Sequence, residues 1–175
     1  LFFHKVLISY FMKQLIAAIA ASCLLCACSS KPIPPLQGSK LVYNQSFSIS
    51  IPSDFEITST SGEQSSLPAH LTVANAENLI TISKASYFRD LKESCKLAAY
   101  NFVHNQNEIT SGPQITGNIC KITATTAGVK SVLFMSRDNK KGILYSITYK
   151  GNLPYIRGIL SSLSGDPFLE ELKNQ

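Results

Sequence analysis

The chain has 175 residues, a formal net charge of +5 at pH 7, and 45% hydrophobic residues. Apart from the pair Lys140 and Lys141, its basic residues are scattered along the sequence. Nucleic-acid binding needs them clustered along one surface, so nucleic acid is excluded as an expected partner.

An apolar segment near the N-terminus has the pattern of a secretory signal peptide. Met12 and Lys13 precede an uncharged run from Leu15 to Ala27. That run is shorter than the roughly 20 apolar residues of a membrane-spanning helix, and a basic start followed by an apolar core and small residues is typical of export signals. We therefore expect residues 1–27 to be a signal peptide and the proline-rich residues 28–39 to be a linker.

The segment Leu25–Cys28, of sequence Leu-Cys-Ala-Cys, resembles the lipobox of bacterial lipoproteins. In that family an apolar residue stands three positions before the modified cysteine, and a small residue stands directly before it. The resemblance implies cleavage before Cys28 and attachment of lipid, palmitate included, to its side chain. Ser29 after it resembles the outer-membrane sorting pattern, which implies a lipid-anchored envelope protein facing the periplasm.

Two alternatives apply to this segment. Cys23, Cys26 and Cys28 are spaced closely enough for a metal site, but zinc takes about four N or S ligands with a polar surrounding shell, which an apolar run does not supply. We interpret residues 1–11 as lying before the true start at Met12. If they are translated, residues 6–27 form a longer apolar segment, interrupted by Lys13, that can act as an uncleaved anchor.

Cleavage before Cys28 leaves 148 of the 175 residues, a length that suits one domain. Two of the 16 basic residues are lost with the signal peptide, so the net charge falls to +3. Cys95 and Cys120 remain, and in an oxidising compartment we favour a structural disulfide between them over two free thiols. The bond would close a loop of roughly 25 residues, contributing about 3 kcal/mol.

The first half of the domain is expected to be mostly strands. Polar and apolar residues alternate from Leu41 to Pro52, which predicts one strand with a buried face. The alternation resumes at Phe55, a polar loop follows over residues 59–68, and residues 71–82 predict a hairpin that turns at Asn-Ala-Glu-Asn.

The strongest helical pattern runs from about Ser86 to Gln106. Its expected buried face carries Phe88, Leu91, Cys95, Ala98, Ala99 and Phe102. Residues 116–126, which contain Cys120, alternate as a strand. A bond between Cys95 and Cys120 would therefore join this helix to the sheet beneath it.

The last third predicts a strand over residues 129–138, a turn at residues 139–142, a strand over 143–151 and a helix from Asn152. Residues 40–165 would form the domain, and the charged tail 166–175 is expected to fray. Tyr145 and Tyr149 share one face of their strand. They are interpreted first as core residues, and otherwise as an aromatic binding patch for a partner or ligand.

This order of elements predicts an α+β fold, an antiparallel β-sheet with a long helix and a C-terminal helix packed on it. The segments Phe47–Ile57 and Tyr155–Leu163 resemble the opening strand and closing helix of the Mog1/PsbP-like fold, and of DcrB-type lipoproteins within it. The resemblance implies a non-enzymatic binding or assembly module.

The mature chain offers little catalytic chemistry. His70 and His104 belong to no nucleophile motif, and the sequence contains no GxSxG, HExxH or glycine-rich phosphate loop. We expect no enzyme, cofactor or metal site. The expected function is that of an accessory or assembly factor of an envelope complex, bound to membrane lipid through Cys28 and to an envelope protein partner. The alternative is a carrier of a small ligand, using a groove between the long helix and the sheet.

Overall fold

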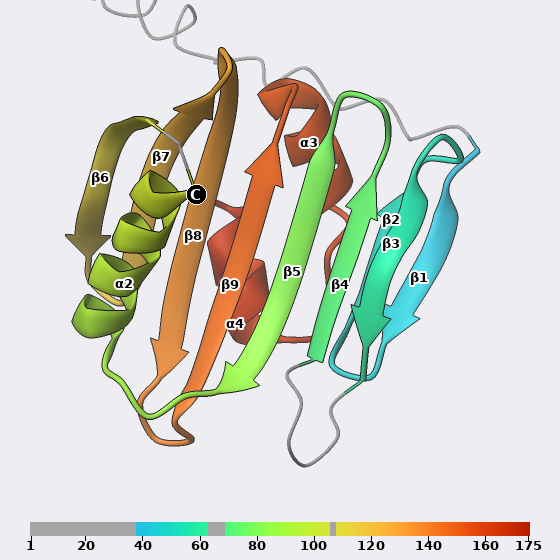
Figure 1. Ribbon diagram of the computed structural model, residues 1–175. Helices are drawn as coiled ribbons and strands as arrows, with labels where there is room; N and C mark the ends of the chain where they lie inside the picture. The colour runs from blue at the N-terminus through green and yellow to red at the C-terminus, as the bar shows by residue number, and fades with distance from the viewer. Residues whose placement is uncertain (1–37, 63–68, 106–107) are drawn as a thin grey trace, which may run out of the picture. The chain divides into compact units, whose positions relative to one another are not determined.

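Seven antiparallel strands form the main sheet of this computed structural model, in the order β3-β4-β5-β9-β8-β7-β6 (Figure 1). The structure describes residues 38–62, 69–105 and 108–175. The chain divides into two units, Leu1–Pro34 and Pro35–Gln175, and every described residue belongs to the second. In chain order the elements are β1 (Lys40–Asn44), β2 (Phe47–Ile51), β3 (Glu56–Ser61), β4 (Ala69–Ala74), β5 (Leu79–Ser86), α2 (Leu91–His104), β6 (Glu108–Thr116), β7 (Ile119–Thr126), β8 (Val129–Asp138), β9 (Ile143–Lys150), α3 (Leu153–Leu160) and α4 (Pro167–Lys173).

Helices cover both faces of this sheet, but only in part. Figure 1 shows α2 in front of the strands β6 to β8, and α3 and α4 behind the sheet. The α+β class expected from the sequence is therefore confirmed, with a long helix and C-terminal helices on an antiparallel sheet.

The larger core lies between the sheet and the layer formed by α3, α4 and the β1–β2 hairpin. Apolar residues at every second position of the strands point into it, as the period of a β-strand requires. Its largest fully buried side chains are Phe55, Ile49, Ile51, Leu71, Ile80, Ile82, Ile147, Ile156, Ile159, Leu163 and Leu169.

A smaller core lies on the opposite face, beneath α2. It consists of Cys95 and Ala99 from the helix and of Cys120, Ile122, Leu133 and Met135 from β7 and β8. On this face of the sheet the buried apolar cluster therefore lies beneath α2.

Four features of the fold differ from the sequence prediction. The strand expected over Leu41–Pro52 is a hairpin, because residues 45 and 46 form a turn and β1 pairs back on β2. The long helix begins at Leu91 rather than Ser86, because Asp90 caps it by accepting a hydrogen bond from the N–H of Glu93 at 2.7 Å. Phe88 therefore lies outside the helix and is exposed. Strand β6 was not predicted.

The fourth correction concerns the C-terminal tail. Residues 167–173 form α4 instead of fraying, and Leu169 and Leu172 are buried against the sheet. Asp166 caps this helix through the N–H of Phe168, and Pro167 supplies the fixed φ that suits a first helical turn. The domain thus continues past residue 165.

Candidate functional site

The structure places the sequence-predicted site residues in three different situations. Cys28 lies outside the described residues. Cys95 and Cys120 are joined in a disulfide that links α2 to β7, with Cα atoms 6.1 Å apart. Both cysteines are fully buried beneath the helix, so the bond has the location that the sequence interpretation gave it.

Tyr145 and Tyr149 do not form an exposed patch. They are 2% and 3% exposed and point into the larger core. The ring of Tyr145 stacks on that of Phe168 from α4, with centroids 4.8 Å apart, and Tyr149 lies beside Phe134. Because α4 covers this face of β9, the interpretation as core residues is correct and the binding-patch interpretation is wrong.

The other face of the same strands carries hydroxyl groups and is uncovered where α2 does not extend. The register of β3, β4, β5 and β9 puts these side chains on one side of the sheet, opposite the larger core. We name this surface the polar face and define it by Ser59, Ser61, His70, Thr72, Thr81, Ser83, Ser146 and Thr148. Each of them is partly or fully exposed to solvent.

Two rows cross the polar face at right angles to the strands. Register pairs Ser61 with His70, His70 with Ser83, and Ser83 with Ser146. The second row runs from Ser59 through Thr72 and Thr81 to Thr148. Because neighbouring strands lie about 4.8 Å apart, each row presents polar groups at a regular spacing.

Hydrogen bonds hold most of these side chains in place. His70 Nε2 lies 2.6 Å from Ser59 Oγ, and His70 Nδ1 lies 2.6 Å from Ser61 Oγ. The hydroxyls of Ser83 and Ser146 are 2.7 Å apart. Those of Thr72 and Thr81 are 3.1 Å apart. The polar face is therefore a pre-ordered array of donors and acceptors.

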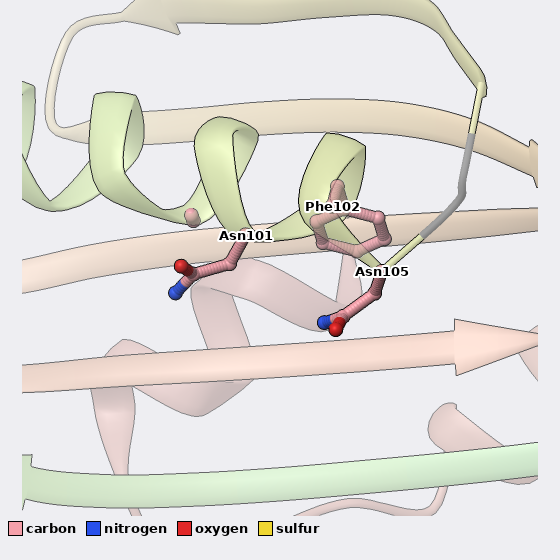
Figure 2. A pocket seen from close by; sticks show the side chains of 4 residues that line it. Asn101, Phe102 and Asn105 are labelled. Atoms are coloured by element: carbon pink, nitrogen blue, oxygen red, sulfur yellow. The ribbon is translucent and has the colours of Figure 1, made fainter.

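Helix α2 covers β6, β7 and β8 on the same side of the sheet as the polar face and carries two amide side chains. A pocket of about 230 Å³ is lined by Ala98, Asn101, Phe102 and Asn105. In Figure 2, Asn101 and Asn105 project from the side of α2 that faces β9 and β5 rather than β6. Helix α2 packs on β6, β7 and β8, so β8 lies between these amides and the polar face. We name the two amides and the polar face together the polar corner.

The polar corner is suited to hydrogen bonding with an uncharged partner. A serine next to a histidine is also the start of a nucleophilic site. Here, however, the third member is the hydroxyl of Ser61, which stabilises an imidazolium far less than a carboxylate does. Among the residues that the structure describes, no three His, Cys, Asp or Glu side chains are grouped to hold a metal ion.

Sequence reasoning found this surface only in part. Alternation within one strand predicts which of its faces is exposed, but a single strand does not reveal which strands lie side by side. Neither Asn101 nor Asn105 is singled out by the sequence, since their place on the helix matters only once the open strands are known to lie on that side of α2. A signal was present in the 3.6-residue period, which puts both amides on one flank of the helix.

Comparisons with known proteins give a structural likeness but no family. No family model matches it, and no curated protein matches it. A crystal structure at 1.50 Å resolution of a protein from Bacteroides thetaiotaomicron VPI-5482 is similar at 13% sequence identity with a TM-score of 0.40. The match covers 74% of this chain and 48% of the other, so this chain spans about half the length of that protein. In the part of the chain that the structure describes, no helix is long and apolar enough to cross a membrane.

Proposed function

We propose that this chain is a lipid-anchored envelope lipoprotein that acts as an accessory or assembly factor of an envelope complex. Its partners would bind at the polar corner. The anchor is supported by the lipobox-like segment that ends at Cys28. Export is supported by the buried disulfide between Cys95 and Cys120, because such bonds form and persist in oxidising compartments.

The observation that carries the binding function is the polar face itself. An antiparallel sheet often exposes one polar face to water, so exposure alone does not indicate a binding site. This face differs in presenting two adjacent rows of hydroxyl groups with one histidine, ordered by internal hydrogen bonds, and in having the amides of α2 project toward its side of the helix. The next row of the same face carries Glu56 and Lys150 at its two ends. Hydroxyl and amide groups cost less to desolvate than charged groups do, and side chains that are already ordered lose little freedom on binding.

A small-ligand carrier is the second candidate, and the pocket beside Phe102 is the observation that favours it. Its volume of about 230 Å³ is smaller than the roughly 300–1,000 Å³ of pockets that enclose drug-sized ligands. The pocket therefore fits one side group of a larger partner better than a whole ligand. This places the carrier behind the partner-binding function.

Site-specific crosslinking in cells tests the proposed function. A photoreactive amino acid at Thr148, at the centre of the polar corner, should give one dominant crosslinked protein. The same group at Lys130, which is exposed at the start of β8 and outside the polar face, is the matched control. The crosslink should disappear with Thr81→Arg, because a bulky charge then occupies the neighbouring position in the same row.

Equal crosslinking from Thr148 and Lys130 would contradict a binding role for the polar corner. A crosslink that persists at full yield with Thr81→Arg would contradict it as well. Circular dichroism of the Thr81→Arg variant distinguishes loss of binding from loss of folding.

A further inference from the structure

One end of the domain carries an exposed aromatic side chain in the loop between β5 and α2. The side chain of Phe88 is 85% exposed. Its ring stacks on that of Tyr87 at a centroid distance of 5.6 Å, and the guanidinium carbon of Arg89 lies 5.3 Å from the centroid of Phe88. The neighbouring side chains thus order the ring without covering it.

The turn between β8 and β9 is joined to this loop and brings further positive charge. The N–H of Tyr87 donates to the carbonyl oxygen of Gly142 at 2.8 Å, and Arg137 Nη2 donates to the carbonyl oxygen of Tyr87 at 3.1 Å. Lys140 and Lys141 are exposed in the same turn. We define the basic tip as Tyr87, Phe88, Arg89, Arg137, Lys140 and Lys141.

The carboxylates nearest to the basic tip are engaged within the chain. Asp138 is 8% exposed, and its Oδ1 accepts the N–H groups of Lys140 at 2.9 Å and Lys141 at 3.2 Å. Asp90 Oδ1 accepts the N–H of Glu93 at the start of α2. The tip holds four cations against these two carboxylates, and three of the four cations are exposed. The first turn of α2 adds Lys92 and Glu93, whose charges cancel.

We propose that the basic tip contacts the surface of a bilayer that contains anionic phospholipids, with Phe88 in the headgroup region and the lysines near the phosphates. An aromatic side chain among Lys and Arg residues is the pattern of interfacial membrane contacts. Each basic residue near an anionic surface raises partitioning about fivefold. Arg89 lies against the ring of Phe88, and the exposed lysines lie in the adjoining turn, so a flat anionic surface can meet these three cations and the ring together.

This contact would be additional to the anchor proposed at Cys28, and it does not depend on it. Stable membrane association commonly takes two weak signals, and a polybasic patch is one that can accompany a lipid chain. A protein at a membrane surface with such a tip would be held in a fixed orientation. The polar corner would then have a fixed orientation relative to the membrane when a partner binds it.

The absence of tryptophan from the sequence makes a direct test possible. Phe88→Trp places a single tryptophan at the basic tip of the full chain. The protein is reconstituted into vesicles of phosphatidylcholine alone, or of equimolar phosphatidylcholine and phosphatidylglycerol. In the anionic vesicles we expect a blue-shifted emission that is quenched by brominated lipids, and in the neutral vesicles neither effect. Raising the salt to about 1 M, where the Debye length is about 3 Å, should reverse both effects.

Charge variants in the same background make the test quantitative. Lys140→Gln with Lys141→Gln should lower the equilibrium constant of tip contact about thirtyfold. Lys96→Gln with Lys130→Gln, which removes two exposed lysines outside the tip, should leave it unchanged. As a control for position, Tyr43→Trp alone places the single tryptophan on β1, at an aromatic position of similar exposure, 76%. The emission of this variant should not depend on lipid charge.

Three results would overturn the proposal. The first is an emission of Phe88→Trp that is the same in neutral and anionic vesicles. The second is equal sensitivity of the emission to the two pairs of lysine substitutions. The third is a salt-sensitive blue shift without quenching by brominated lipid, which would assign the tip to a protein contact instead.

Discussion

Cys95 and Cys120 stabilise the domain chiefly through the length of chain that their bond closes. Their sequence separation is 25 residues, and such a loop lowers the entropy of the unfolded chain by an amount worth about 3 kcal/mol. The double variant Cys95→Ala/Cys120→Ala should lose about this much unfolding free energy, equivalent to a fall in Tm of about 10 °C. Urea and thermal denaturation would measure both quantities.

A reducing agent provides the control for this prediction. Dithiothreitol should lower the stability of the wild-type protein and leave that of the double variant unchanged. Equal stability of the wild-type protein with and without reductant would mean that the bond contributes nothing.

Tyr149 and Tyr155 make the stability of the domain sensitive to alkaline pH. Burial raises the pKa of Tyr149, and Arg157 partly offsets this through its charge and a hydrogen bond. Burial also raises the pKa of Tyr155, and the Asp54 carboxylate beside its hydroxyl, 3.4 Å away, raises it further. The folded-state pKa values therefore exceed the ordinary value of 10.0 that applies to the unfolded chain.

The direction of the pH effect follows from these two tyrosines. Above pH 10 the unfolded chain loses their protons first, so the stability that is fully present below that pH is lost as pH rises through the folded-state pKa. Tyr149→Phe should make the decline of unfolding free energy above pH 10 less steep, and Tyr149→Phe/Tyr155→Phe less steep again. Urea denaturation across this pH range measures the slope. The same slope in all three proteins would refute the assignment.

At the residue scale, the sequence predicted buried positions better than exposed ones. The assignment of Tyr145 and Tyr149 to the core followed from strand alternation. Phe88 was placed on a buried helix face because it continues the 3.6-residue period of α2. The cap at Asp90 starts the helix after Phe88, and a periodic pattern of apolar residues does not reveal where a helix begins.

Among the elements, α4 is the one whose existence the sequence least suggested. Its seven residues are too few for a helix to be stable alone, and three of them are charged. Burial of two leucines against the sheet compensates for its short length. The charged residues of the tail therefore gave the wrong prediction, because the contacts that stabilise α4 come from β8 and β9, which are distant in sequence.

Leu172→Ala tests whether α4 is an integral part of the domain. Leu172 is 1% exposed, so its truncation should destabilise the protein by roughly 2–5 kcal/mol. The neighbouring exposed residue gives a matched control, because Glu171→Ala should change stability by no more than about 0.5 kcal/mol. Denaturation with urea measures both, and equal values for the two variants would support the frayed tail instead.

The remaining elements show where sequence patterns suffice. The hairpin of β4 and β5 and the meander of β7, β8 and β9 were predicted from alternation and turn residues. Strand β6 was not, and the β1–β2 hairpin was taken for one strand. β6 is an edge strand whose residues 111–116 are all exposed, so no alternation of buried positions marks it. In β2 the alternation is complete, and it does not reveal the turn at residues 45 and 46.

At the scale of the whole molecule, the strand order creates surfaces that no single segment contains. The polar face combines β3, β4, β5 and β9, and the basic tip combines the loop after β5 with the turn after β8. β9 is inserted beside β5, more than fifty residues away in sequence, so neither surface could be derived from local patterns. The fold class, in contrast, needs only the order of elements and was predicted correctly.

The central claim is that Cys28 carries the membrane anchor of an envelope lipoprotein. The most direct measurement is fractionation of cells that express the wild-type chain, Cys28→Ala or the matched control Cys26→Ala, with the intact mass of the purified wild-type protein. We predict that the wild-type and Cys26→Ala proteins fractionate with membranes, that Cys28→Ala does not, and that the wild-type mass equals residues 28–175 plus acyl chains. A Cys28→Ala protein that stays in the membrane, or a wild-type mass that includes residues before Cys28 and no lipid, would contradict the claim and favour an uncleaved anchor.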